Sequence, residues 1–206
     1  MLISEEKGFL YYHLYKVAGT SIRNSLLPYC SRRVAAMQNI NYGLRTFGIK
    51  IIDNPLYQFH PDLNDVKSLL GEEFYKYYRF TFVREPLDWQ KSLYFFTKKN
   101  SRHHQHSIVK SMDFDSYIDW RIENDLKLQS DLIYDGNECL VNEIYKFEEI
   151  NEAFDKIKSK FSLSTVLKHK NIAGKGKTIA LSNSMKIKFL DAFEDDYRKL
   201  GYTPSM

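Results

Sequence analysis

The sequence is short of cysteine: Cys30 and Cys139 are the only two in 206 residues. Two cysteines are too few for a disulfide framework, and we expect both to be free thiols in a reducing compartment. The N-terminal residues lack the basic region and the long apolar stretch of a signal peptide. No run of about 18 apolar residues occurs, so we expect no membrane span. Together these absences predict a cytoplasmic protein.

Linkers rich in glycine, serine or proline are also absent, and so are internal repeats. Hydrophobic residues make up 43% of the chain and aromatic residues 15%, which is enough for a sizeable core. We therefore predict a single domain over residues 1–206. The net charge of +4 is compatible with an anionic ligand but does not call for nucleic acid. We predict no nucleic-acid partner.

The hydrophobic pattern alternates between strands and helices along the chain. This alternation is typical of an α/β fold with a central, mainly parallel sheet flanked by helices. Residues 31–54 give no clear pattern beyond a short strand at 49–52. The predicted strands cover residues 9–15, 77–83 and 140–147, and the predicted helices cover residues 63–70, 86–96, 150–161 and 184–200, with a further helix starting near residue 115.

The first predicted strand runs through a turn of small residues into a helix. A helix N-terminus has unpaired N–H groups and a positive dipole end, which makes it suited to an anion. Lys16 adds a full charge at this point, and Gly19 allows the backbone to approach a ligand. Thr20 and Ser21 can cap the helix or donate to an oxyanion. The turn is a candidate phosphate site, although a capped turn with a solvated lysine has the same pattern.

The second predicted strand ends directly at Arg84, and Pro86 then begins a helix. In open α/β sheets, ligands bind beyond the carboxyl ends of the strands, so Lys16 and Arg84 are both expected there. The helix is expected to bury a stripe at helical spacing, made of Trp89, Leu93 and Phe96.

Residues 171–178, NIAGKGKT, nearly match a nucleotide-binding loop, but Asn171 stands where its first glycine belongs. No later strand is expected that could supply an aspartate for Mg²⁺. A small-molecule kinase is therefore an alternative, and lysines 156–177 leave open a non-catalytic module that binds polyanions.

Two segments of the chain resemble the cofactor-binding motifs of sulfotransferases. HLYKVAGTSI is similar to the 5′-phosphosulfate loop, with Tyr15 where proline is usual. FTFVREPLDWQKSLYFF is similar to the 3′-phosphate segment, with Glu85 in place of Asp or Asn. The C-terminal part, including HKNIAGKGKT, is similar to bacterial members of the group that contains carbohydrate sulfotransferases.

The resemblance implies a P-loop-like three-layer α/β fold that uses 3′-phosphoadenosine-5′-phosphosulfate and no metal. It also implies transfer of the sulfuryl group to a hydroxyl of a carbohydrate-type acceptor, which is small or a glycan and can be anionic. Lys16 would stabilise the leaving phosphate. The implied cofactor-binding residues are Lys16, Ala18, Gly19, Thr20 and Ser21 for the 5′-phosphate, Arg84 and Ser92 for the 3′-phosphate, and Asn171, Lys175 and Lys177 in the C-terminal part.

An acceptor hydroxyl needs a general base, and His60 is the candidate. It stands just before a predicted helix, and the ordinary pKa of histidine suits the task. A surface histidine without a function is the competing interpretation, and His13, inside the first strand, is expected to be structural. The histidines at 103, 104 and 106 match no usual metal-ligand spacing, so we predict no metal site.

Overall fold

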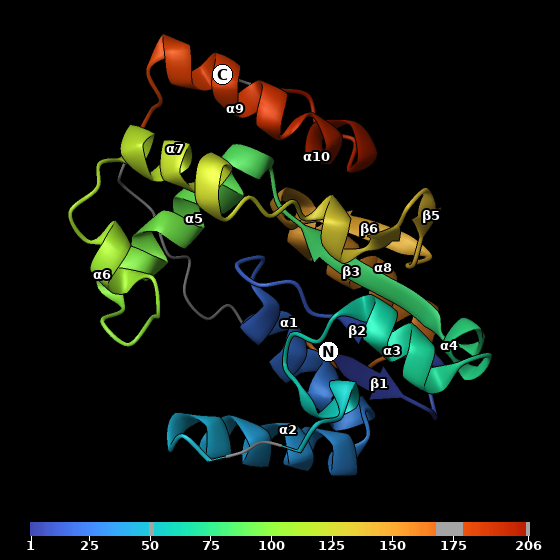
Figure 1. Cartoon of the computed structure of the whole chain (residues 1–206). Helices are drawn as coiled ribbons and strands as arrows, with labels where there is room; N and C mark the ends of the chain where they lie inside the picture. The colour runs from blue at the N-terminus through green and yellow to red at the C-terminus, as the bar shows by residue number, and fades with distance from the viewer. Residues whose placement is uncertain (50–51, 168–178, 205–206) are drawn as a thin grey trace. The chain divides into compact units, whose positions relative to one another are not determined.

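The computed structural model describes residues 1–49, 52–167 and 179–204 (Figure 1). The chain divides into two compact units. The first is made of Met1–Val83 and Leu132–Lys170, and the second of Arg84–Asp131 and Asn171–Met206. The expectation of one domain over residues 1–206 stays a prediction.

A four-stranded sheet with the order β1-β2-β3-β6 lies in the first unit. The central pairings, β2 with β3 and β3 with β6, are parallel, whereas β1 runs antiparallel to β2. The chain therefore has an α/β fold, as predicted, with a small mixed sheet whose centre is parallel. The strands are β1 (Leu2–Ser4), β2 (Phe9–Tyr12), β3 (Tyr78–Val83) and β6 (Glu143–Lys146).

Strands β2 and β3 are apolar along most of their length because other elements cover them. All of β2 is buried, and β3 is buried from its second residue onward. Thr81 is a polar exception, and its hydroxyl donates to the carbonyl of Tyr12 at 2.8 Å. Phe161, at the end of the helix that follows β6, packs on Phe9 and Phe80, with ring centroids 5.0 and 6.1 Å away. These contacts fix the sheet beneath the loop that leaves β2.

The remaining elements of the first unit are mostly short. A two-stranded hairpin turns at Gly136, which has a φ of 59°. The elements are α1 (Gly19–Leu26), η1 (Leu27–Tyr29), α2 (Arg32–Thr46), η2 (Pro55–Tyr57), α3 (Leu63–Leu70), α4 (Glu73–Lys76), β4 (Tyr134–Asp135), β5 (Glu138–Cys139), η4 (Phe147–Glu149) and α8 (Ile150–Phe161).

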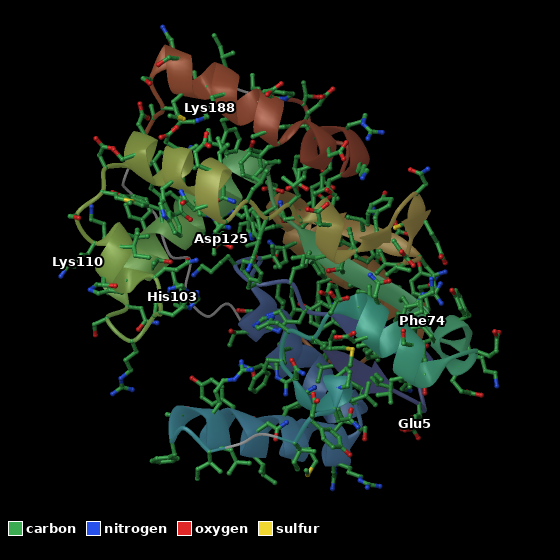
Figure 2. All side chains as sticks on the ribbon, viewed as in Figure 1. Glu5, Phe74, His103, Lys110, Asp125 and Lys188 are labelled. Carbon is green, nitrogen blue, oxygen red and sulfur yellow. The ribbon has the colours of Figure 1, made fainter. Side chains whose placement is uncertain are left out.

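The second unit is helical in its described residues. Its core includes Tyr94, Tyr117 and Phe193, all buried. Lys188 ties two of its helices together by bonding Asp119 at 2.7 Å and Glu123 at 2.5 Å (Figure 2). The helices are α5 (Pro86–Lys99), α6 (His106–Val109), α7 (Phe114–Asn124), α9 (Asn183–Ala192) and α10 (Glu194–Lys199), and η3 (Ser130–Leu132) lies where the chain returns to the first unit.

Four sequence predictions about these elements are wrong in detail, and the strand expected at 49–52 lies partly outside the described residues. The first strand, expected at 9–15, ends at Tyr12. The helix expected at 184–200 is interrupted at Phe193, where the backbone has φ −109° and ψ 15°. The strand expected at 140–147 is the shorter β6. Phe96, expected in a buried stripe, is 41% exposed, whereas Trp89 and Leu93 are buried as predicted.

Both cysteines are free thiols, as the sequence predicts. Cys30 is buried and Cys139 is half-buried, and burial raises the pKa of the Cys30 thiol to about 12. None of the helices in residues 1–49, 52–167 and 179–204 is both long and apolar enough to cross a bilayer.

Candidate functional site

The loop between β2 and α1 contains two residues in the left-handed region of backbone space. Lys16 has φ 67° and Ala18 has φ 57°, and neither is glycine. Val17 between them is fully buried and holds the loop against the core. Residues in this conformation cost free energy and collect at binding sites, where turned amide groups can form a concave anion site. Lys16 itself is half-buried at the start of this turn.

The N-terminus of α1 is suited to an external anion. Ala18 is the N-cap residue and gives no side-chain cap, and the first turn contains no acidic residue. The amides of Ser21 and Ile22 turn back to the carbonyl of Ala18, at 2.9 and 3.2 Å. Helix geometry leaves the amides of Gly19 and Thr20 for a partner outside the helix. Thr20 is exposed and Ser21 is buried, so Thr20 is the better placed of the two to meet a ligand.

Gly19 has a structural role that was not predicted from the sequence. A Cβ atom at this position would lie 1.5 Å from Nε2 and 1.9 Å from Cδ2 of His13. The His13 ring therefore occupies the space that any side chain at position 19 would need. It is buried and stacks on Tyr11, with ring centroids 5.8 Å apart. Gly19 lets the helix start close to this ring, so its absent side chain serves internal packing.

His60 lies against the same loop, although 47 residues separate it from His13. Its Nδ1 is 2.7 Å from the carbonyl oxygen of His13, and the two rings are 4.5 Å apart. Tyr15 meets the His60 ring edge-on at 6.1 Å. The fold thus brings together the predicted base and the predicted 5′-phosphate loop.

The contact with His13 fixes the tautomer of His60. A carbonyl oxygen can only accept, so Nδ1 carries the proton and Nε2 has the lone pair. Partial burial of the ring lowers the pKa of His60 to about 4; the His13 hydrogen bond opposes this, and the charges of the N-terminal amino group and of Arg23 act in the same direction as burial. His60 is nevertheless exposed. At neutral pH it is an uncharged ring that can accept a proton at Nε2.

The segment that carries His60 is held by α2. The side-chain amide of Asn41 donates to the carbonyls of Ile52 and Tyr57, at 2.9 and 3.2 Å, and its oxygen accepts from the amide of Ile52 at 3.0 Å. Asn41 is 4% exposed. This residue was not found from the sequence, because a buried asparagine leaves no hydrophobic signal.

Arg84 lies in the second unit, where Gln129 holds its backbone. The Gln129 side chain accepts from the Arg84 amide at 2.9 Å and donates to the Arg84 carbonyl at 2.7 Å. The backbone amides of Gln129 and Ser130 in turn donate to the buried carboxylate of Asp196, at 3.0 and 2.7 Å. This chain of hydrogen bonds fixes the backbone from which the half-buried Arg84 side chain extends.

Glu85 and Ser92 flank Arg84 in the sequence. Glu85 is the N-cap of α5: one carboxylate oxygen accepts from the Asp88 amide at 2.7 Å. Its other oxygen accepts from the Tyr197 hydroxyl at 2.6 Å. Ser92 lies on α5 and is half-buried.

The other predicted site residues, Asn171, Lys175 and Lys177, lie outside the described residues. Lys16 and Arg84 belong to different units, so a common ligand for them stays a prediction. Of the three histidines after α5, His103 and His104 stack with ring centroids 4.5 Å apart, and Nδ1 of His106, the first residue of α6, is 3.0 Å from the carbonyl oxygen of Thr97.

Comparisons of the chain with protein-family models, with curated proteins and with solved structures find no match.

Proposed function

We propose that the protein is a sulfotransferase that moves a sulfuryl group from 3′-phosphoadenosine-5′-phosphosulfate to a hydroxyl of a carbohydrate-type acceptor. The observation that carries the proposal is the contact of His60 with the loop before α1. A neutral histidine with its lone pair on Nε2 is held against the one loop that the sequence assigns to the 5′-phosphate. Base and phosphate loop must be neighbours for an in-line transfer.

The residues of the loop fit a phosphate. The start of α1 has no side-chain cap and no acidic residue in its first turn, and the left-handed Lys16 and Ala18 shape the backbone before it. The amides of Gly19 and Thr20 would donate to phosphate oxygens. The ammonium of Lys16 would balance the negative charge on the leaving phosphate. No carboxylate in the first turn of α1 opposes an anion.

In the proposed reaction, the acceptor oxygen forms a bond to sulfur while the bond from sulfur to the 5′-phosphate oxygen breaks. The acceptor proton goes to Nε2 of His60 and from there to solvent. When bound, the nucleotide supplies the sulfuryl group and a good leaving group, and the protein positions the reactants and stabilises the charge.

Further parts of the proposal depend on the resemblance. A P-loop-like fold is proposed for the α/β core, and Arg84 and Ser92 are proposed to hold the 3′-phosphate. Asn171, Lys175 and Lys177 are proposed to complete the nucleotide site. We place the reaction in the cytoplasm because both cysteines are free.

Calorimetric titration with 3′-phosphoadenosine-5′-phosphate tests the nucleotide site. We expect a Kd of about 1 μM for the wild-type protein, on the order of −8 kcal/mol. Loss of the charge-assisted bonds of Arg84 in Arg84→Ala should cost about 1.5–3 kcal/mol, or roughly 10- to 150-fold in Kd. Arg102→Ala is the matched control, because Arg102 is an exposed arginine of the same unit. Its Kd should equal that of the wild type.

The same titrations separate the alternatives. A kinase would bind ATP with Mg²⁺ and not 3′-phosphoadenosine-5′-phosphate. Its ATP binding should be lost in Lys177→Ala and kept in Lys16→Ala. Salt-dependent binding of heparin without binding of the nucleotide would favour a polyanion module. Absence of nucleotide binding by the folded wild-type protein would overturn the sulfotransferase proposal.

A further inference from the structure

A pocket of about 220 Å³ lies between α2 and residues 57–60, all within the first unit. Of the lining residues that the structure describes, four lie on one face of α2 and four in the segment that ends at His60. Most small-molecule pockets measure roughly 300–1,000 Å³. The pocket is therefore suited to a ligand about as large as one sugar ring.

One of the polar residues that line the pocket is buried and incompletely hydrogen-bonded. Gln38, which lines it, is completely buried, and its Nε2 donates to the carbonyls of Met1 and Leu56, at 3.0 and 2.8 Å. Because carbonyls cannot donate, these bonds fix the orientation of the amide and make Oε1 its acceptor. Oε1 has no hydrogen-bond partner among the described residues. A buried acceptor without a donor is costly, and a ligand hydroxyl that displaced the atoms covering Oε1 would remove that cost.

The rim of the pocket is aromatic and positively charged. Tyr42 is 65% exposed and meets the Phe59 ring edge-on, with centroids 5.7 Å apart. Arg45 follows three residues later on the same helix, so it lies on the same side, and it is exposed. Among the described residues that line the pocket there is no aspartate or glutamate. Aromatic rings present apolar area to the C–H face of a sugar, and a guanidinium can hold a carboxylate with two hydrogen bonds.

We propose that this pocket binds the acceptor as a single saccharide unit that carries a carboxylate. Arg45 holds the carboxylate, the Tyr42 ring covers one face of the sugar, and the ligand hydroxyls bond Gln38 Oε1 and the ring of His60. That this sugar is the acceptor depends on the proposed sulfuryl transfer. That the pocket binds an anionic sugar depends only on the residues that line it.

The test is a chemical-shift titration of the full chain with methyl β-D-glucuronide and, as the neutral match, methyl β-D-glucoside. Because the contact of Arg45 with the carboxylate is open to solvent, we expect the glucuronide to bind about twofold to fivefold more tightly. Arg45→Gln should remove this preference and leave the glucoside unchanged. Arg33→Gln, an equal change of charge at an exposed position of the same helix, should keep it. Tyr42→Ala should weaken both sugars.

Equal binding of the two sugars, no saturable binding of either, or an unchanged preference in Arg45→Gln would overturn the inference. A parallel titration with 3′-phosphoadenosine-5′-phosphate separates it from the proposed function. Nucleotide binding without glucuronide binding would refute the saccharide-binding role of the pocket and would still support the proposed sulfuryl transfer. Glucuronide binding without nucleotide binding supports the saccharide pocket and refutes the sulfotransferase.

Discussion

Replacing Gly19 by alanine sets two physical effects against each other. Gly19 begins α1, and an alanine in a helix is normally favoured over glycine by about 0.5–1 kcal/mol. At this position, however, the new Cβ atom would lie 1.5 Å from Nε2 of His13. Either the helix start or the His13 ring must move.

The loss of stability in Gly19→Ala depends on how tightly the His13 ring is packed. The residue is 8% exposed, and its ring stacks on Tyr11 at 20° and lies 4.5 Å from that of His60. Forcing extra atoms into a packed core costs about 1–3 kcal/mol. Subtracting the helix preference of about 0.5–1 kcal/mol leaves about 0–2.5 kcal/mol, and the 1.5 Å approach to His13 Nε2 places Gly19→Ala in the upper part of that range, at about 1–2.5 kcal/mol. For a chain of this size that lowers Tm by roughly 2–10 °C.

Urea denaturation followed by circular dichroism can measure this difference. Gly43→Ala is the matched control, because Gly43 lies inside α2 and a Cβ atom added there would meet no atom within 4 Å. This control should stabilise the protein by about 0.5–1 kcal/mol. In the His13→Ala background the clash is gone, and Gly19→Ala should become neutral or stabilising. An equal loss in both backgrounds, or wild-type stability with His13 in place, would refute the reasoning.

Three further predictions concern other contacts. The pKa of His60 falls from 6.5 to about 4 on folding, so the unfolded chain binds more protons between these values. The free energy of unfolding should therefore fall as the pH drops from about 6.5 to about 4. Urea titrations across this range should show a smaller fall for His60→Gln than for the wild type, and an unchanged fall for the control His104→Gln. Tyr197→Phe removes the bond to the Glu85 carboxylate and should lower the free energy of unfolding by about 1.5–3 kcal/mol, measured by the same method. Asn41→Ala removes three hydrogen bonds and should cost about 2–4 kcal/mol, whereas no change in stability would mean that water replaces them.

The sequence predicted helices and strands correctly where several signals within a few residues of each other indicate the same element. The apolar run of β3 followed by Pro86 predicted the strand to within one residue and the start of α5 at the right residue. The helix at 150–161 was also right, because Phe154 and Ile157 occupy its buried face. Hydrophobic spacing and proline geometry act within a few residues, so they need no knowledge of the fold.

The sequence failed where polar or distant contacts decide. The 15-residue helix α2 was missed because its buried positions are Ala35, Gln38 and Asn41, which give no apolar periodicity. The break at Phe193 has no glycine or proline to announce it. The position of His60 in a loop could be predicted, but its contact with His13 spans 47 residues and depends on the fold.

On helix α2, the residues that stabilise the fold and those proposed to select a ligand differ in burial. Gln38 and Asn41 are buried and fix neighbouring backbone, whereas Tyr42 and Arg45 are exposed at the pocket rim. A substitution at either exposed position can therefore alter which ligand is preferred at little cost to the stability of the fold. Substitutions of the buried Gln38 and Asn41 would cost stability, so we expect evolution to change the proposed ligand preference through the rim residues.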